Sequence, residues 1–209
     1  MTARISAIPA RVRRRAAARC HTGTVDTPEP PRLLPVDDYL ASLPRAYLAA
    51  GAVITDESDR LLIVKPTYRT HWSLPGGTVD AGEDPAQCVV REVAEETGLT
   101  VTMVRLAAVH WTRHVDGRES GGRPTRGHPG LLFVFDCGTV PDGTEVRLPS
   151  DELEDFRWCD PEEAFRLLSP GTVRRLRAAL AVRDRGGTAF VSGNTPPGPH
   201  DWAPDIHVH

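Results

Sequence analysis

Three glutamates, Glu92, Glu95 and Glu96, stand at positions i, i+3 and i+4 of one short segment. In a helix, a turn of about 100° per residue places them within about 100° of one another on one face. Like charges this close repel, and a hard divalent cation among the carboxylate oxygens relieves the repulsion. Because Mg²⁺ keeps positions for water and substrate phosphates, the pattern indicates metal-assisted hydrolysis of a polyphosphate.

The helix that must position these glutamates is predicted at residues 85–97. Asp84 is suited to cap it, with Gln87 three residues later, Pro85 suits its first position, and Gly98 is placed to end it. The stripe expected to face the core consists of Ala86, Val89, Val90, Val93 and Thr97. The three glutamates then lie opposite the core, and on this pattern alone a solvated acidic face is an alternative.

The flanking sequence predicts a sheet around this helix. Residues 47–54 and 61–64 are apolar runs on either side of a polar turn, which is typical of a β-hairpin. A short strand at 72–74 is expected to run into a break at Pro75-Gly76-Gly77. Further strands are predicted near 101–111, 131–137, 145–148 and 155–159, and helices from Asp160 and over 171–184.

Residues upstream of the glutamates complete a longer motif. The segment 77–99 resembles a complete Nudix box. It consists of Gly77, five residues, Glu83, seven residues, Arg91-Glu92-Val93, one residue, Glu95-Glu96, one residue and Gly98-Leu99. A chance match has a probability on the order of 10⁻⁸ per starting position. With the neighbouring elements, the resemblance covers residues 46–184. It implies an α/β fold, the Nudix-type α/β/α sandwich with a mixed central β-sheet, and a phosphoanhydride hydrolase.

The resemblance also implies roles for residues of the motif. Glu92, Glu95 and Glu96 are the expected metal ligands, and the backbone carbonyl of Gly77 is a further one. The expected cofactor is Mg²⁺, which Mn²⁺ can replace. Glu83 and Arg91 are expected to orient the helix carboxylates.

The general base is expected to be either Glu95 or a glutamate on a later loop. Asp151-Glu152-Leu153-Glu154 resembles that loop. Glu152 is the preferred candidate there and Glu154 the second. Acids that only cap or solvate a strand end are the alternative interpretation.

The substrate is expected to be a nucleoside triphosphate or a nucleoside-diphosphate-linked small molecule. About fifteen residues past the box, the sequence is Arg113-His114-Val115, which lacks the Pro or Tyr that marks some subfamilies. Arg69, Trp72, Arg113 and His114 are candidate substrate contacts, although an aromatic residue near a strand end, such as Trp72, usually belongs to the core. The long polar segment 113–129 could close on a polyphosphate or form a hairpin tip.

Charge and hydropathy limit the other classes of function. The net charge is −3, with six arginines and no acid in residues 1–20, so the remainder carries 19 basic and 28 acidic residues. This acidic body argues against nucleic acid as the main partner. No transmembrane run or secretory signal is found, so no membrane partner and a cytoplasmic location are expected. A homodimer is compatible with the resemblance, and a non-catalytic nucleotide-sensing module of the same fold is the alternative function.

The sequence is predicted to have three regions. Residues 1–45 are predicted to be an extension and linker, and residues 46–184 the catalytic domain. Residues 185–209, which are polar and rich in Gly and Pro, are predicted to be a loose tail.

Overall fold

The computed structural model describes residues 34–101, 105–112, 129–148, 151–193 and 207–208. The chain divides into two compact units, Met1–Leu43 and Pro44–His209. In the first unit the described element is α1 (Val36–Ser42), a short helix with no buried residue, at a place where the sequence predicted only an extension. None of the helices in the described ranges is long and apolar enough to span a bilayer.

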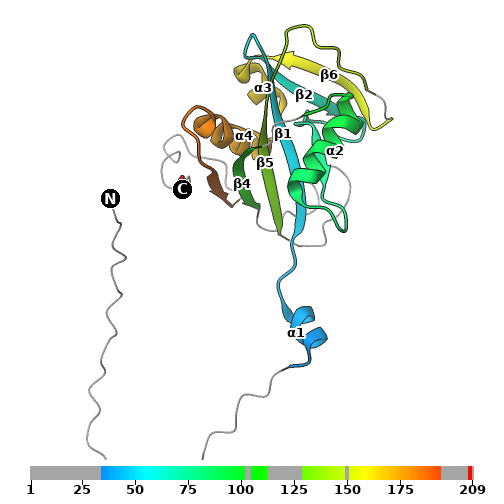
Figure 1. The fold of residues 1–209 in the computed structure, drawn as a ribbon, viewed down its shortest axis with the longest axis vertical. Coiled ribbons are helices and arrows are strands. Elements are labelled where there is room, and N and C mark those ends of the chain that lie inside the picture. Colours follow the sequence, from blue (N-terminus) through cyan, green and yellow to red (C-terminus); the bar gives the residue numbers. More distant parts are fainter. Residues whose placement is uncertain (1–33, 102–104, 113–128, 149–150, 194–206, 209) are drawn as a thin grey trace, which may run out of the picture. The chain divides into compact units, whose positions relative to one another are not determined.

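The second unit is built on a mixed sheet in which β1 (Tyr47–Asp56) is an interior strand (Figure 1). Strand β1 runs antiparallel to β2 (Leu61–Pro66) and β3 (Gly76–Thr78), and parallel to β5 (Gly130–Val140). The remaining pairings extend the sheet at both ends. Strand β2 pairs with β6 (Leu153–Cys159), β5 with β4 (Arg105–Thr112), β4 with β7 (Ala189–Ser192), and β7 with β8 (His207–Val208).

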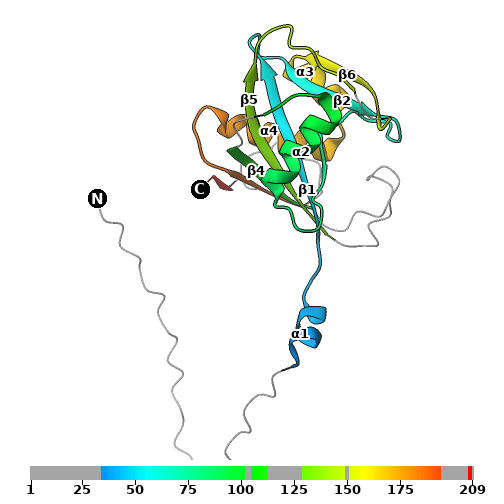
Figure 2. The ribbon, with the colours of Figure 1, turned by 45° about the vertical axis from the view of Figure 1, so that its right-hand side comes forward.

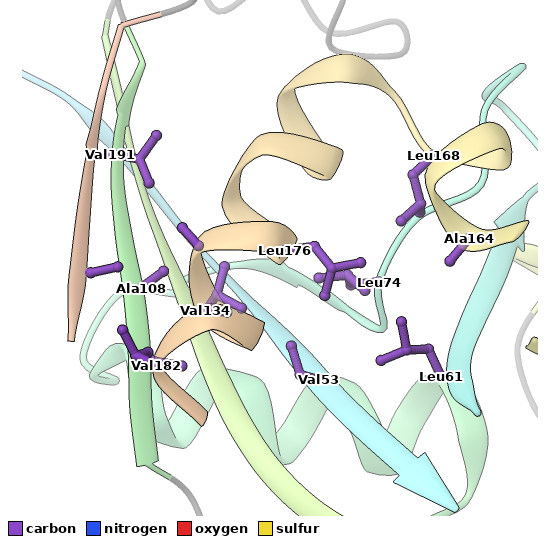
Figure 3. Packing of buried hydrophobic residues seen from close by; sticks show 14 of the residues in the cluster. Val53, Leu61, Leu74, Ala108, Val134, Ala164, Leu168, Leu176, Val182 and Val191 are labelled. Atoms are coloured by element: carbon purple, nitrogen blue, oxygen red, sulfur yellow. The ribbon is translucent and has the colours of Figure 1, made fainter. Parts of the chain in front are cut away.

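Helices cover both faces of this sheet, which confirms the predicted α/β/α sandwich (Figure 2). On one face α2 (Pro85–Thr97) packs its Val89 and Val93 with Ile54 of β1. On the other face α3 (Pro161–Leu167) and α4 (Pro170–Arg183) pack against Val53 and its neighbours, and Figure 3 shows this layer. Adjacent residues of β1 point to opposite faces of the sheet, and an apolar core covers each face. Successive residues of the strand are therefore apolar, and do not alternate between apolar and polar.

The Trp72-Ser73-Leu74 segment is not the strand that the sequence predicted. It forms two isolated bridges, Ser73 to Val64 and Trp72 to Leu168, while the paired strand β3 lies in the predicted break. Gly76 explains the difference. Its φ is +141°, and a Cβ there would lie 2.1 Å from the carbonyl oxygen of Ala50, so only glycine allows this close pairing with β1.

Two other segments also differ from the predictions. Residues 145–148 form no strand. The sheet continues past residue 184, because β7 lies inside the segment that was predicted to be a loose tail. Ala189 and Val191 of β7 are buried, while the residues between and after them are exposed. These two alternate residues pack in the hydrophobic core that α4 covers, and β7 pairs with β4.

Candidate functional site

Helix α2 begins and ends where the sequence predicted. The carboxylate of Asp84 accepts hydrogen bonds from the amides of Ala86 and Gln87, and the Gln87 side chain accepts one from the Asp84 amide. This reciprocal capping satisfies donors that the first turn leaves free. Gly98 ends the helix with φ 69°, which is a left-handed conformation. The caps therefore fix where the glutamates of the last turns lie.

The three glutamates of α2 differ in exposure, which corrects the prediction that all of them lie opposite the core. The Glu95 side chain is 59% exposed, the Glu92 side chain is 16% exposed, and Glu96 is 9% exposed. The cause is β3, which packs beside α2 and covers Glu92 and Glu96. Sequence periodicity could not show this cover, because β3 was expected to be a break.

Glu92 and Glu96 both lie against the two glycines of β3. The Gly76 amide donates a hydrogen bond of 2.7 Å to Oε2 of Glu96. A Cβ on Gly77 would lie 2.3 Å from Oε1 of Glu92, so the absence of a side chain makes room for this carboxylate. The Gly77 carbonyl, the predicted backbone ligand, accepts a hydrogen bond from the Cys88 thiol at 3.8 Å.

Arg91 is the hub of the acidic cluster. Its Nη2 donates to Oε1 of Glu83 at 2.7 Å, and its Nη1 donates to Glu92 at 2.9 Å and to Glu95 at 3.0 Å. A further bond from Nη2 reaches the carbonyl of Thr78 in β3. One guanidinium thus connects the loop before the helix, the helix itself and β3. The bond between Arg91 and Glu83 is the contact that their predicted role in orienting the helix carboxylates requires.

Burial and hydrogen bonding act on these carboxyls in opposite directions. Hydrogen bonds from the Arg91 side chain lower the pKa of Glu83 to about 2. Burial is the main cause that raises the pKa of Glu96 to about 8, and the charges of Glu92 and Glu152 raise it further. Burial also raises the pKa of Glu92. The site therefore has a deficit of positive charge at its buried end.

The later loop brings Glu152, rather than Glu154, to this cluster. The charge of Glu152 acts on both Glu92 and Glu96, and its backbone carbonyl accepts a hydrogen bond of 2.9 Å from the amide of Thr67. Glu154 instead forms an ion pair of 3.1 Å with Lys65. Of the two predicted base candidates on this loop, the one beside the helix carboxylates is thus Glu152.

The four predicted substrate contacts lie in different environments or outside the described residues. Arg69 is exposed, and its charge acts on Glu96. Trp72 is half-buried against the α4 core, and the guanidinium carbon of Arg157 lies 4.9 Å from the centroid of its ring, so this ring contact is already made within the protein. Arg113 and His114 lie outside the described residues, and the roles of all four stay predictions.

Two polar residues near the α4 face were not predicted. His110 of β4 is buried, and Arg175 of α4 is a guanidinium whose pKa burial lowers to about 10. No motif marks either residue. The only signal in the sequence is a histidine inside an otherwise apolar strand, and the arginine resembles any other in an amphipathic helix.

The donor set beside β3 suits a hard cation, because it consists of carboxylate oxygens. Among the described residues, however, no three acidic, His or Cys side chains already converge as a ligand set. Glu92 and Glu95 point to Arg91, and Glu96 is bonded to the Gly76 amide. Residues of this kind could hold a divalent cation once these hydrogen bonds are exchanged for metal contacts.

Comparison with known proteins assigns this fold and motif to one family. The family model described as the NUDIX domain matches residues 46–181. The CTP pyrophosphohydrolase of Escherichia coli is 32% identical over 139 residues, which are 64% of this chain and 90% of that protein. The asymmetrical bis(5'-nucleosyl)-tetraphosphatase of Caenorhabditis elegans is 29% identical over 123 residues, covering 57% of this chain and 83% of its own length.

A solved structure agrees with these matches. The crystal structure of the MutT protein from Methanosarcina mazei superimposes with a TM-score of 0.51 at 26% identity, over 68% of this chain and 95% of that one. The family match spans more than half of the chain, and its limits enclose β1, the whole box and most of α4. The chain therefore belongs to the NUDIX domain family.

Proposed function

We propose that the chain is a metal-dependent hydrolase that cleaves a phosphoanhydride bond in a nucleoside triphosphate or a nucleoside-diphosphate-linked small molecule. Two relatives support the reaction class, since one is named for CTP and the other for a dinucleoside tetraphosphate. Both names describe hydrolysis of linked phosphates, and they differ in the nucleotide.

The observation that carries this proposal is the state of Glu96. Its carboxylate is buried, it is bonded to the Gly76 amide, and no Arg or Lys of the described chain forms an ion pair with it. An unpaired buried carboxylate is costly, and the pKa of about 8 expresses that cost. A divalent cation would supply the missing positive charge beside Glu92 and Glu96.

The proposed ligands are Glu92, Glu95, Glu96 and the carbonyl of Gly77, with Mg²⁺ as the ion and Mn²⁺ as a substitute. When bound, the cation supplies charge neutralisation and orientation of the phosphoanhydride. Arg91 would keep the ligands in place by holding Glu83 on its other side. The positive charge of Arg69 would lie near the phosphates, because it already acts on Glu96.

Glu152 is the proposed general base. In the reaction, a water oxygen bonds to phosphorus, the bond from that phosphorus to the bridging oxygen breaks, and the phosphorylated fragment leaves. The proton released by the water passes to the Glu152 carboxylate. Glu95 is the other candidate, and its carboxylate accepts a hydrogen bond of 3.0 Å from Arg91, which competes with a water for that oxygen.

A screen of nucleoside triphosphates and nucleoside-diphosphate-linked compounds, with Mg²⁺, Mn²⁺ or a chelator, tests the proposal. Products are identified by mass, and labelled water shows which phosphorus is attacked. We expect metal-dependent release of a nucleoside monophosphate, and a loss of kcat by several orders of magnitude in E96Q. The matched control is E145Q, since Glu145 is exposed and its carboxylate pairs with Arg147 rather than with Arg91.

The alternative is a nucleotide-sensing module without catalysis. Ligand-dependent thermal stabilisation with no phosphate release from any compound would favour it. Equal turnover in E96Q and E145Q would remove the proposed ligand role of Glu96. A homodimeric state and a cytoplasmic location stay predictions.

A further inference from the structure

A loop connects the end of β2 to β3, and hydrogen bonds fix both of its ends. Val64 of β2 and Ser73 bond to each other twice, with amide-to-carbonyl distances of 2.9 and 2.8 Å, so they close residues 65–72 into a loop. Three residues beyond Ser73, the Gly76 amide donates to Oε2 of Glu96. The segment therefore leads directly from β2 to the buried end of the acidic cluster.

The same loop is bonded to the loop that carries Glu152. The Thr67 amide donates to the Glu152 carbonyl at 2.9 Å, and the Thr67 hydroxyl donates to the same oxygen at 3.2 Å. The pairing of β2 with β6 shifts register just before this contact, between Lys65 and Pro66, so the Thr67 bonds lie beyond the regular ladder. One continuous segment is thus hydrogen-bonded to Glu152 near its start and to Glu96 at its end.

The Lys65 side chain braces this loop. Its Nζ donates to the Arg69 carbonyl, in the middle of the loop, at 2.6 Å, and to the Pro66 carbonyl at 3.4 Å. The third acceptor is the Glu154 carboxylate, which lies 3.1 Å from Nζ. An ammonium has three donors, so each of them has an acceptor here. The Lys65 side chain is only 19% exposed, which limits competition from water.

The residue type at position 65 fits this contact. Of the 25 lysines and arginines in the sequence, Lys65 is the only lysine. An ammonium directs its three donors away from a single nitrogen, whereas a guanidinium presents its donors as a planar fork that suits one carboxylate. The acceptors around Nζ are two backbone carbonyls and a carboxylate from another loop, so they suit an ammonium better than a fork.

We infer that Lys65 is a positioning residue for the proposed hydrolysis. Its bond to the Arg69 carbonyl keeps the loop in the shape in which Thr67 reaches the Glu152 carbonyl. The proposed general base is thereby held at a set position relative to Glu96, because the same segment continues to that carboxylate. This inference rests on the proposed function, since it takes Glu152 as the base.

The main experiment is a double-mutant cycle of K65M and E152Q in the full chain, with steady-state kinetics in Mg²⁺ on the best of CTP, ATP, GTP and UTP. We expect K65M to lower kcat at least about tenfold when Glu152 is present, and less than about twofold in E152Q, because a positioning residue acts through the group that it positions. The matched control is E154Q, which removes the carboxylate partner of Lys65 and leaves both carbonyl bonds. An equal loss of kcat in both backgrounds would overturn the inference and leave the hydrolase proposal intact.

Chemical rescue separates the ammonium from a general effect of the substitution on the fold. Treatment of K65C with bromoethylamine forms a thioether that carries an ammonium, at nearly the length of a lysine side chain. The described cysteines, Cys88, Cys137 and Cys159, are buried, and the unmodified chain treated in the same way is the control. We expect treated K65C to recover at least about half of the kcat of that control, and K65R to recover less. No recovery in treated K65C that is folded would overturn the inference.

A further readout does not need turnover. The Thr67 amide should exchange its hydrogen at least about tenfold faster in K65M than in E154Q, because the loop that maintains its bond to Glu152 is released. If K65M fails to fold, T67V, which removes the hydroxyl bond alone, should lower kcat when Glu152 is present and not in E152Q. Faster exchange without hydrolysis of any compound would support the bracing of the loop and remove the hydrolase proposal. Unchanged exchange in K65M would overturn the role of Lys65.

Discussion

The backbone amide of Gly76 donates a 2.7 Å hydrogen bond to Oε2 of Glu96, and this bond joins β3 to the last turn of α2. It places a buried carboxylate beside a glycine strand rather than on an open helix face. Glu92 reaches the same strand at Gly77. The acidic cluster therefore depends on two elements, and changes in β3 should affect chemistry as strongly as changes in α2.

The first prediction concerns Gly77. In G77A the added methyl group would lie 2.3 Å from Oε1 of Glu92, so the carboxylate must move. Since a displacement of about 1 Å can cost about 100-fold in rate, we expect kcat to fall about 100-fold while the melting temperature changes little. The control is G51A on the neighbouring strand, where the added methyl group meets its nearest atoms at 3.7 Å. Comparable kcat values in both variants would contradict the placement of Glu92.

The second prediction concerns Arg91. R91M removes the shared partner of Glu83, Glu92 and Glu95, and leaves their charges uncompensated. We expect the free energy of unfolding to fall by about 1–3 kcal/mol without divalent cation. Mg²⁺ should reduce that loss, because the cation takes over part of the compensation. Urea unfolding of the unmodified chain and R91M, each with and without Mg²⁺, measures both effects. A loss that Mg²⁺ leaves unaltered would argue against a cation among these carboxylates.

Much of this arrangement could be predicted from the sequence. The bounds of α2 follow from Asp84, Pro85 and Gly98, since capping is local chemistry. The hairpin of β1 and β2 and the mixed sheet were also predicted, because long apolar runs and the box motif specify them. The match of the NUDIX domain model to residues 46–181 agrees with the family prediction.

The remaining features depend on contacts between distant segments. The burial of Glu96 requires β3, and β3 exists because Gly76 and Gly77 approach β1 closely, whereas Gly-Gly in a sequence is typical of a break. Strand β7 follows a polar stretch, and contacts with distant segments stabilise it: the pairing with β4 and the burial of Ala189 and Val191. His110 and Arg175 are brought together by the packing of α4 on the sheet, which no local pattern shows.

The third prediction separates the two loop glutamates. E152Q should lower kcat about 100- to 10,000-fold, as expected for loss of a general base. E154Q should stay within about twofold of the unmodified chain, because Glu154 pairs with Lys65 instead. Steady-state kinetics with Mg²⁺ provide the comparison. Near-normal turnover in E152Q with a large loss in E95Q would transfer the role of base to Glu95.

The fourth prediction concerns pH and His110. Its pKa is about 4 in the folded chain, where burial and the charges of Arg174 and Arg175 lower it, against about 6.5 when unfolded. The unfolded chain therefore binds the proton more tightly, and the folded state loses stability as the pH falls from about 6.5 to about 4. The loss due to this group approaches about 3 kcal/mol.

Chemical unfolding at several pH values, for the unmodified chain and H110Q, isolates this contribution, since other titrating groups are common to both. The difference in free energy of unfolding between them should shift in favour of H110Q as the pH falls towards 4. A difference that is constant over this range would mean that His110 is not neutral and buried in the fold.

The most direct measurement of the central claim is a Mn²⁺ titration followed by electron paramagnetic resonance, on the unmodified chain, E96Q and E145Q. If the buried carboxylate beside Gly76 completes a cation site, the unmodified chain and E145Q should bind Mn²⁺ with the same affinity, and E96Q should bind it at least about tenfold more weakly. Equal affinity in all three proteins, or no binding to any of them, would contradict the account.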